Sequence, residues 1–191
     1  MSPATISTDL RIAVIIGSVR DGRFGPQVGA WVQKFLAESA IDADVIDLAG
    51  LTFPPTMREH PDVASFATRI SHADAIVIVT PEYNHSYPGP LKTAIDSLRE
   101  QWRAKPVAFV SYGGMAGGLR AVEALRLVFA ELHAVTIRDT VSLHNPWAPA
   151  DDPNIDYPDN ACAQALTRMM RQLLWWAEAL RTARHGAPYP A

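Results

Sequence analysis

Short apolar runs rich in β-branched residues alternate with longer amphipathic segments along this sequence. The run at Arg11–Gly17 (RIAVIIG) is apolar almost throughout, which is typical of a strand buried on both faces of a parallel sheet. Similar runs predict four further strands at Asp44–Leu48, Asp74–Thr80, Pro106–Tyr112 and Ala134–Arg138. Apolar residues at helical spacing predict helices at Pro26–Ser39, His60–His72, Pro88–Arg99, Gly118–His133 and Ala161–Arg184.

Five strands that alternate with five helices predict βαβ units with right-handed crossovers, and therefore a parallel sheet covered on both faces. The two common solutions are the six-stranded dinucleotide-binding fold and a five-stranded sheet in the order 2-1-3-4-5, and the strand count favours the second. Residues 139–160, rich in Pro, Asp and Asn, are predicted to form a surface loop. We expect one domain over residues 1–191, with flexible tails at 1–10 and 185–191.

Composition narrows the class of protein without naming a function. With 48% hydrophobic and 19% charged residues, the chain is typical of a globular domain. A net charge of −3 favours neither a nucleic-acid-binding protein nor a strongly acidic carrier. The single cysteine, Cys162, rules out an intramolecular disulfide, and residues 1–10 lack the features of a signal peptide. No apolar run approaches the roughly 18 residues of a membrane span. We therefore expect a cytoplasmic protein without nucleic-acid or membrane partners.

Ligands of open parallel sheets bind beyond the carboxyl ends of the strands, near the point where the strand order reverses. This rule selects the loops after the first, third and fourth strands. The first loop, residues 17–27, leads into a helix N-terminus and carries Ser18, Arg20 and Arg23, which suit phosphate binding. It has neither a nucleotide-hydrolase P-loop nor the G-x-G-x-x-G spacing of dinucleotide folds. An ordinary Gly-rich turn with solvated arginines is the alternative.

The second loop, residues 81–92, crowds a carboxylate, two tyrosines, an amide and an imidazole at the end of a strand. Aromatic and amide groups beside backbone donors suit a flat heteroaromatic ligand with polar edges. His85 could act as a general acid, or it could be solvated or structural. Ser86, His85 and Glu82 lie too close on one loop to align as a hydrolytic triad, and no G-x-S-x-G elbow supports one. A second His or acid at metal-ligand spacing is also missing from this loop, so we expect no metal site.

The third loop, residues 111–120, holds four glycines between a strand and a helix. Its exposed backbone N–H groups could stabilise negative charge on the oxygens of a bound cofactor, and a flexible linker is the alternative.

Together the three loops resemble the NAD(P)H-dependent FMN reductase family, which includes FMN-dependent azoreductases, quinone reductases and chromate reductases. The matching segments are GSVRDGRFGPQV at 17–28, TPEYNHSYPGPLKTAIDSL at 80–98 and SYGGMAGGLRAVEALR at 111–126. The similarity covers about residues 11–138. It implies a flavodoxin-like three-layer α/β sandwich with a five-stranded parallel sheet in the order 2-1-3-4-5.

The resemblance also implies a role for individual residues. The FMN phosphate loop is matched by Ser18, Arg20, Arg23, Phe24, Gly25 and Gln27. The segment along the isoalloxazine ring is matched by Pro81, Glu82, Tyr83 and Asn84, and the loop at its pyrimidine edge by Ser111, Gly113 and Gly114. Many relatives have a Ser and an Asn where Arg23 and Gly25 stand here, which leaves the individual phosphate ligands open.

The activity that the resemblance implies is hydride transfer from NAD(P)H to bound FMN, followed by electron transfer to a small acceptor. Such acceptors are quinones, azo compounds, free flavins and metal oxyanions, and no catalytic side chain is expected because the flavin performs the chemistry. A flavin-binding electron carrier or redox-sensing partner protein without nicotinamide turnover is the alternative. Relatives are commonly dimers or tetramers, and the segments 88–99 and 118–133 could form such an interface.

Overall fold

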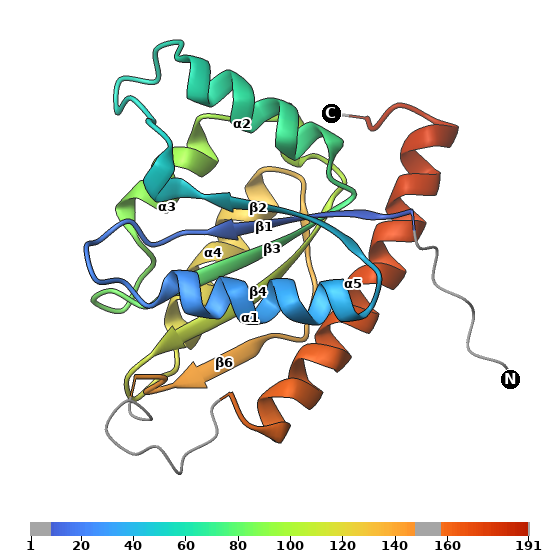
Figure 1. Ribbon diagram of the computed structural model, residues 1–191. Coiled ribbons are helices and arrows are strands. Elements are labelled where there is room, and N and C mark those ends of the chain that lie inside the picture. Colours follow the sequence, from blue (N-terminus) through green and yellow to red (C-terminus); the bar gives the residue numbers. More distant parts are fainter. Residues whose placement is uncertain (1–8, 148–157, 191) are drawn as a thin grey trace, which may run out of the picture.

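The computed structural model describes residues 9–147 and 158–190 and contains a parallel sheet between two layers of helices (Figure 1). The strands are β1 (Arg11–Ile16), β2 (Asp42–Asp47), β3 (Ala75–Pro81), β4 (Pro106–Gly113), β5 (Val135–Thr136) and β6 (Val141–His144). Their order is β2-β1-β3-β4-β5, and β6 also pairs with β4. The predicted order 2-1-3-4-5 is therefore confirmed.

The helices form the outer layers of a three-layer α/β sandwich, as predicted. They are α1 (Gly25–Glu38), α2 (Pro61–His72), α3 (Gly89–Asp96), α4 (Leu119–Glu131) and α5 (Asn160–Gly186), with 3-10 turns η1 (Leu48–Gly50) and η2 (Glu100–Trp102). One core cluster packs α1 and α5 on one face of the sheet, and a second packs α2, α3 and α4 on the other (Figure 1). Among the described residues, no helix combines the length and apolar character needed to cross a membrane.

The burial of the central strands explains the continuous apolar runs in their sequences. Every residue of β3 and of β4 is buried. Along β3, Val77 and Val79 belong to the core under α1 and α5, whereas Ile76 and Ile78 belong to the opposite core. A strand buried on both faces takes apolar residues at most positions, so it shows no polar alternation.

The fifth position of the sheet differs from the prediction. In place of one strand at Ala134–Arg138, β5 pairs with the start of β4 and β6 pairs with its end. Between them, the Arg126 guanidinium donates hydrogen bonds to the carbonyl oxygens of Ile137 (2.7 Å) and Arg138 (3.0 Å). The predicted loop at 139–160 is thus wrong for residues 141–144, and its residues 148–157 lie outside the described part of the chain.

Two predicted boundaries also shift. The helix expected at Pro88–Arg99 ends at Asp96, and the buried Trp102 indole donates to the Ile95 carbonyl (3.1 Å) at that end. At the chain ends, where tails were expected, Leu10 is fully buried and α5 continues to Gly186. Residues 1–8 and 191 of those tails lie outside the description.

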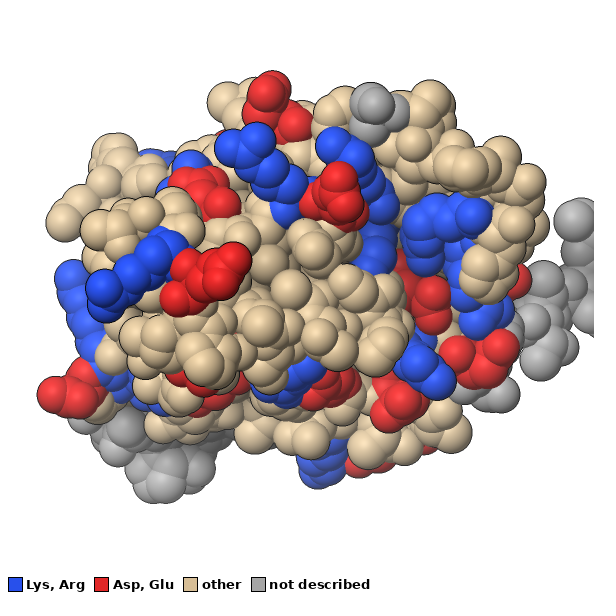
Figure 2. Space-filling view, turned by 90° about the horizontal axis from the view of Figure 1, so that it is seen from above, with Lys and Arg blue, Asp and Glu red and all other residues tan. Residues whose placement is uncertain are grey.

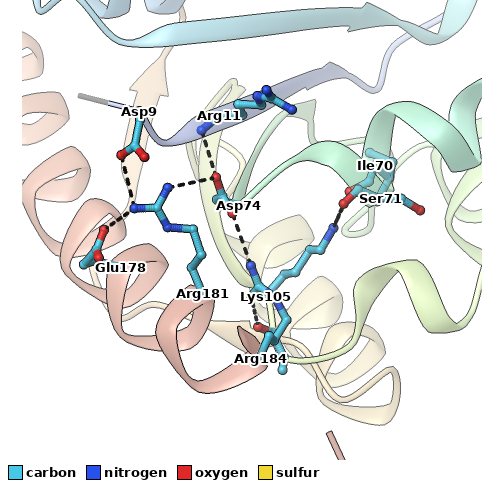
Figure 3. A network of polar contacts seen from close by, with 10 residues as sticks. Asp9, Arg11, Ile70, Ser71, Asp74, Lys105, Glu178, Arg181 and Arg184 are labelled. Atoms are coloured by element: carbon cyan, nitrogen blue, oxygen red, sulfur yellow. Dashed lines mark hydrogen bonds and ion pairs between the residues drawn. The ribbon is translucent and has the colours of Figure 1, made fainter. Parts of the chain in front are cut away.

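The end of α5 is held to the amino-terminal edge of the sheet by a charged network (Figure 3). Asp74 accepts hydrogen bonds from the Arg11 amide (3.1 Å) and from Arg184 (3.3 Å). Arg184 also donates to the Ala104 carbonyl (2.6 Å), while Arg181 bonds Asp9 (3.1 Å). This network lies at the edge opposite the loops selected above, so it stabilises the fold away from them.

Acidic and basic side chains are interspersed on the face seen from above in Figure 2, and neither sign dominates it. This distribution agrees with the small net charge of −3.

Candidate functional site

The loops after β1, β3 and β4 meet at the carboxyl edge of the sheet, on the left in Figure 1. The Tyr112 hydroxyl at the end of β4 donates to Ser18 Oγ in the first loop across 3.1 Å. The Arg20 guanidinium of the first loop lies 3.8 Å from the centre of the Tyr83 ring in the second. The Glu82 amide in turn donates to the Tyr112 carbonyl (3.0 Å). Three segments that are distant in sequence therefore form one connected group.

The first loop is rich in unused backbone donors. The N–H groups of residues 18–25 and of Gln27 have no hydrogen-bond acceptor within the described part of the chain. The N-cap residue of α1, Phe24, makes no side-chain capping bond. Free N–H groups at a helix N-terminus, where the helix dipole is positive, form a site for an anionic group such as phosphate.

Gly25 occupies a position with no room for a side chain. A Cβ atom there would lie 2.3 Å from Ser18 Oγ and 2.9 Å from Ile16 Cγ2. Ser18 and Tyr112 fill this space, and both are buried. Burial raises the pKa of Tyr112 to about 12, opposed by its hydrogen bond to Ser18. The phenol therefore remains a protonated donor at physiological pH, and the close packing accounts for glycine at position 25.

The two arginines of the first loop have different surroundings. Arg23 forms a bidentate ion pair with Asp47 at the end of β2, with N–O distances of 3.1 and 2.9 Å. Asp47 also caps η1 by accepting a hydrogen bond from the Ala49 amide (3.1 Å). Arg20 is exposed, and apart from its stacking on Tyr83 it has no hydrogen bond or ion pair within residues 9–147 and 158–190. Arg20 thus keeps its donors available for a ligand, whereas Arg23 joins the first loop to β2.

The second loop makes a tight reversal directly after β3. Tyr83 and Ser86 exchange backbone hydrogen bonds of 2.8 and 3.0 Å, and the two residues between them, Asn84 and His85, both have positive φ (50° and 66°). Positive φ at both central positions is the requirement of a type I′ turn, which Asn tolerates well. The turn presents the exposed side chains of Asn84 and His85 at the tip of the loop.

Glu82 links the second loop to the third. Its carboxylate accepts from the Arg120 side chain (2.7 Å) and from the Arg120 amide (3.3 Å) in the first turn of α4. A carboxylate at a helix N-terminus is stabilised by the positive end of the helix dipole. Glu82 therefore fixes the relative position of two loops, next to Pro81, which is the last residue of β3.

The third loop requires glycine and uses Ser111 for its own shape. Gly118 has φ +87°, and a Cβ there would lie 2.6 Å from the Ser111 Cβ atom. The buried Ser111 hydroxyl donates to the Gly117 carbonyl (2.9 Å). Gly113 is the last residue of β4 and Gly114 follows it directly, and the N–H groups of residues 114–116 and 118 have no acceptor in the described ranges. The loop therefore offers backbone donors, and its serine hydroxyl is already engaged.

Three residues that support the third loop are not predicted by the sequence pattern. The Asn145 amide donates to the Gly113 carbonyl (2.7 Å), Ser142 Oγ donates to the Gly117 carbonyl (2.9 Å), and His144 Nδ1 lies 3.2 Å from the Met115 carbonyl oxygen. All three belong to β6 or follow it, in a segment predicted as loop. The alternation of buried Val141 and Leu143 with Ser142 and His144 is the period-two signal that could have revealed this strand.

The fold defines the chain as a flavodoxin-like α/β protein, and the three loops gather at the carboxyl edge of its sheet. Residues 10–148 match the family model described as NADPH-dependent FMN reductase. The chain belongs to this family.

Individual relatives agree with this assignment. A 2-hydroxy-1,4-benzoquinone reductase from Burkholderia sp is 31% identical over 175 residues, which are 86% of this chain and 92% of that protein. An NAD(P)H-dependent FMN reductase from Schizosaccharomyces pombe is 36% identical over 122 residues, or 56% of this chain. That match spans 60% of the yeast protein. Among solved structures, the flavoenzyme NAD(P)H:(acceptor) oxidoreductase FerB from Paracoccus denitrificans has a TM-score of 0.71 and 27% identity, covering 89% of this chain and 98% of FerB.

The predicted family, the flavodoxin-like fold, the oxidoreductase class and the use of FMN with NAD(P)H are confirmed at the level of the family. At this level no individual residue is assigned a role and no acceptor is identified.

Proposed function

We propose that this protein holds FMN at the three loops, accepts hydride from NADH or NADPH, and passes electrons to a small acceptor. Quinones are the leading class of acceptor because a relative covered over 92% of its length is named as a benzoquinone reductase. Azo compounds, free flavins and metal oxyanions are the other candidates. The observation that carries the proposal is the row of unbonded N–H groups at residues 18–25, beside the available guanidinium of Arg20.

In this proposal the first loop holds the FMN phosphate. The backbone N–H groups and Arg20 supply the direct contacts, since charge-assisted hydrogen bonds to phosphate are stronger than neutral ones. The small residues Ser18 and Gly25 let the loop backbone approach the phosphate closely. The ion pair between Arg23 and Asp47 holds the loop in place. Phe24, which packs edge-on against Tyr112 with centroids 6.2 Å apart, and Gln27 complete the proposed set.

The second and third loops hold the ring system of the cofactor. Pro81, Tyr83 and Asn84 would lie along the ring system. Glu82 would fix the relative position of the two loops through its ion pair with Arg120. The N–H groups of the loop that leaves β4 at Gly113 and Gly114, shaped by Ser111, would donate to oxygens at the edge of the ring. Bound FMN supplies a two-electron centre at N5, so the protein's task is to bind, orient and limit access of water.

We further propose a cytoplasmic homodimer or homotetramer. Met115 on the third loop and Leu119 and Leu127 on α4 have exposed apolar side chains, which such an interface would cover and which support this assembly.

One spectroscopic experiment tests the proposal. The purified protein is incubated with FMN, passed over a desalting column, and its absorbance is recorded anaerobically before and after NADH or NADPH is added. We expect retained flavin that is bleached by the nucleotide and restored by a benzoquinone, with weaker retention of riboflavin, which lacks the phosphate. Failure to bind FMN would refute the site. Bound FMN that neither nucleotide bleaches would refute the reductase and indicate an electron carrier.

A further inference from the structure

The imidazole of His144 lies between two hydrogen-bonding groups beside the third loop. Its Nδ1 atom is 3.2 Å from the Met115 carbonyl oxygen, and its Nε2 atom is 3.3 Å from Ser142 Oγ. Ser142 Oγ is in turn 2.9 Å from the Gly117 carbonyl oxygen. The ring is exposed, so it exchanges protons with solvent.

The number of protons on His144 decides which of these contacts can form. A carbonyl only accepts, so Nδ1 must carry a proton to bond Met115. The Ser142 hydroxyl has one proton, and if it is donated to Gly117, Nε2 must carry a proton to donate to Ser142 Oγ. All three bonds therefore exist together only when the ring is doubly protonated. In the neutral ring one of the three bonds is always lost. With the proton on Nδ1, Nε2 accepts the Ser142 hydroxyl and the bond from Ser142 to Gly117 is lost, whereas with the proton on Nε2 the bond to Met115 is lost.

These contacts orient the peptide groups of the third loop. The carbonyls of Gly113, Met115 and Gly117 all accept donors from residues 142–145. In a trans peptide the N–H points opposite to the preceding C=O, so the N–H groups of residues 114, 116 and 118 face away from β6. Because β3 and β6 pair with opposite edges of β4, this direction leads toward the loop after β3. The same three N–H groups have no acceptor within the described chain.

We propose that His144 is a positioning residue whose second proton locks the third loop with its N–H groups directed at the cofactor, so that protonation of His144 strengthens FMN binding. This inference rests on the proposed FMN site. It assigns a function to a side chain on β6 that has no place among the expected FMN contacts.

The groups that surround the ring are mainly neutral hydrogen-bonding groups. The third loop contributes the Met115 and Gly117 carbonyls, β4 contributes the Ser111 hydroxyl, and β6 contributes Ser142. The charged groups at the start of α4 and the end of β3, Arg120 and Glu82, pair with each other at 2.7 Å. Within residues 9–147 and 158–190, His144 forms no ion pair.

The first measurement uses the protein without FMN. Nitrogen-15 NMR of the histidine rings is recorded between about pH 5.5 and 9, the range in which histidines change charge. We expect both nitrogens of His144 to be protonated at the acid end, and the amide signals of residues 114–118 to shift with the same midpoint as the ring. A ring that stays singly protonated across the whole range would overturn the inference.

The second measurement compares FMN dissociation constants of the wild type and His144→Asn over the same pH range. Asparagine places an amide nitrogen where Nδ1 stands and keeps the bond to Met115, but it cannot gain a proton. The phosphate of FMN, with a second pKa of about 6, titrates identically in both experiments, so it cancels in their ratio. Because one net hydrogen bond is lost, we expect the FMN affinity of the wild type to fall about 2- to 10-fold relative to that of His144→Asn as the ring deprotonates.

A variant that breaks the chain of bonds at its other member serves as the control. Ser142→Ala removes the group through which the proton acts, so its affinity ratio to His144→Asn should not change with pH. A wild-type ratio that is also constant from pH 5.5 to 9 would overturn the role of His144 while leaving the FMN site intact. Absence of FMN binding at every pH would refute the proposed function itself.

Discussion

Tyr112 and Ser18 are joined by a buried hydrogen bond in which the phenol donates to Ser18 Oγ across 3.1 Å. The bond connects the end of β4 with the loop after β1, and the two residues are 94 positions apart in sequence. Since both side chains are 4% exposed or less, neither can exchange this partner for water. The conformation of the proposed phosphate loop therefore depends on a residue of another strand.

Removing this donor should affect both stability and binding. In Tyr112→Phe the ring still packs against Phe24, but Ser18 Oγ is left buried without its donor, which costs about 1–2 kcal/mol of unfolding free energy. We expect a loss of that size in urea unfolding and several-fold weaker FMN binding by fluorescence quenching. Tyr87→Phe is the matched control, because the Tyr87 hydroxyl has no hydrogen bond within the described residues. Unchanged FMN affinity in Tyr112→Phe would show that the bond does not shape the loop.

The close packing at Gly25 gives a second prediction. Gly25→Ala places a methyl group 2.3 Å from Ser18 Oγ, and overpacking of this kind costs about 1–3 kcal/mol. Thermal and urea unfolding should show this loss, together with weaker FMN binding. At Gly50 a Cβ meets nothing within 4 Å, so Gly50→Ala should be close to neutral. A Gly25→Ala variant as stable as Gly50→Ala would contradict this explanation.

The sequence predicted the elements whose burial is uniform and missed those that depend on partners. β3 and β4 are buried at every residue, so their apolar runs were unmistakable. At the fifth position the predicted strand is shorter than expected and β6 was not predicted, because β5 and β6 have only two and four residues and Arg126 from α4 bonds the carbonyls between them. A break held by a side chain from another element leaves no signal in the local sequence pattern.

The sequence predicted which loops meet at one edge of the sheet, but not the contacts between them. The strand-end rule brought the loops containing Ser18, Tyr83 and Gly113 to one edge, where the structure places them. It could not show that Arg23 is bound by Asp47, or Glu82 by Arg120, because these pairs are separated by 24 and 38 residues and depend on sheet register. Arg20 and Arg23 are equivalent in the sequence pattern, and only the fold shows that Arg23 is paired with an acidic residue and that Arg20, within the described residues, is not.

This difference between the two arginines can be measured. Arg20→Gln removes an available guanidinium, so FMN affinity should fall about 10-fold, as expected for a hydrogen bond to a charged group. Riboflavin affinity should fall much less, and the salt dependence of FMN binding should weaken. Arg23→Gln instead breaks a pair with Asp47 whose side chains are 17% and 35% exposed, so it should mainly lower stability, by about 1 kcal/mol or less. Equal losses of FMN affinity in the two variants would contradict these separate roles.

Lys105 links the sheet to the end of α2, far from the proposed site (Figure 3). Its ammonium donates to the carbonyl oxygens of Ile70 and of Ser71, the latter at 2.9 Å. The side chain is buried, and this burial lowers the pKa of Lys105 from 10.5 to about 8. The nearby charge of Arg184 acts in the same direction, and Asp74 opposes it.

The lowered pKa of Lys105 predicts a rise in stability with pH. Between about pH 8 and 10.5 the unfolded chain keeps the Lys105 proton while the folded chain releases it, so the unfolding free energy increases across this window and is insensitive to this group below it. Lys105→Met has no such proton. The unfolding free energy of the wild type minus that of Lys105→Met should therefore rise by about 2 kcal/mol from pH 7.5 to 10, measured by urea unfolding. The same subtraction with Lys34→Met, at a side chain 75% exposed, corrects for general effects of pH. A difference that stays flat or falls for Lys105 would contradict the proposed cost of burying its charge.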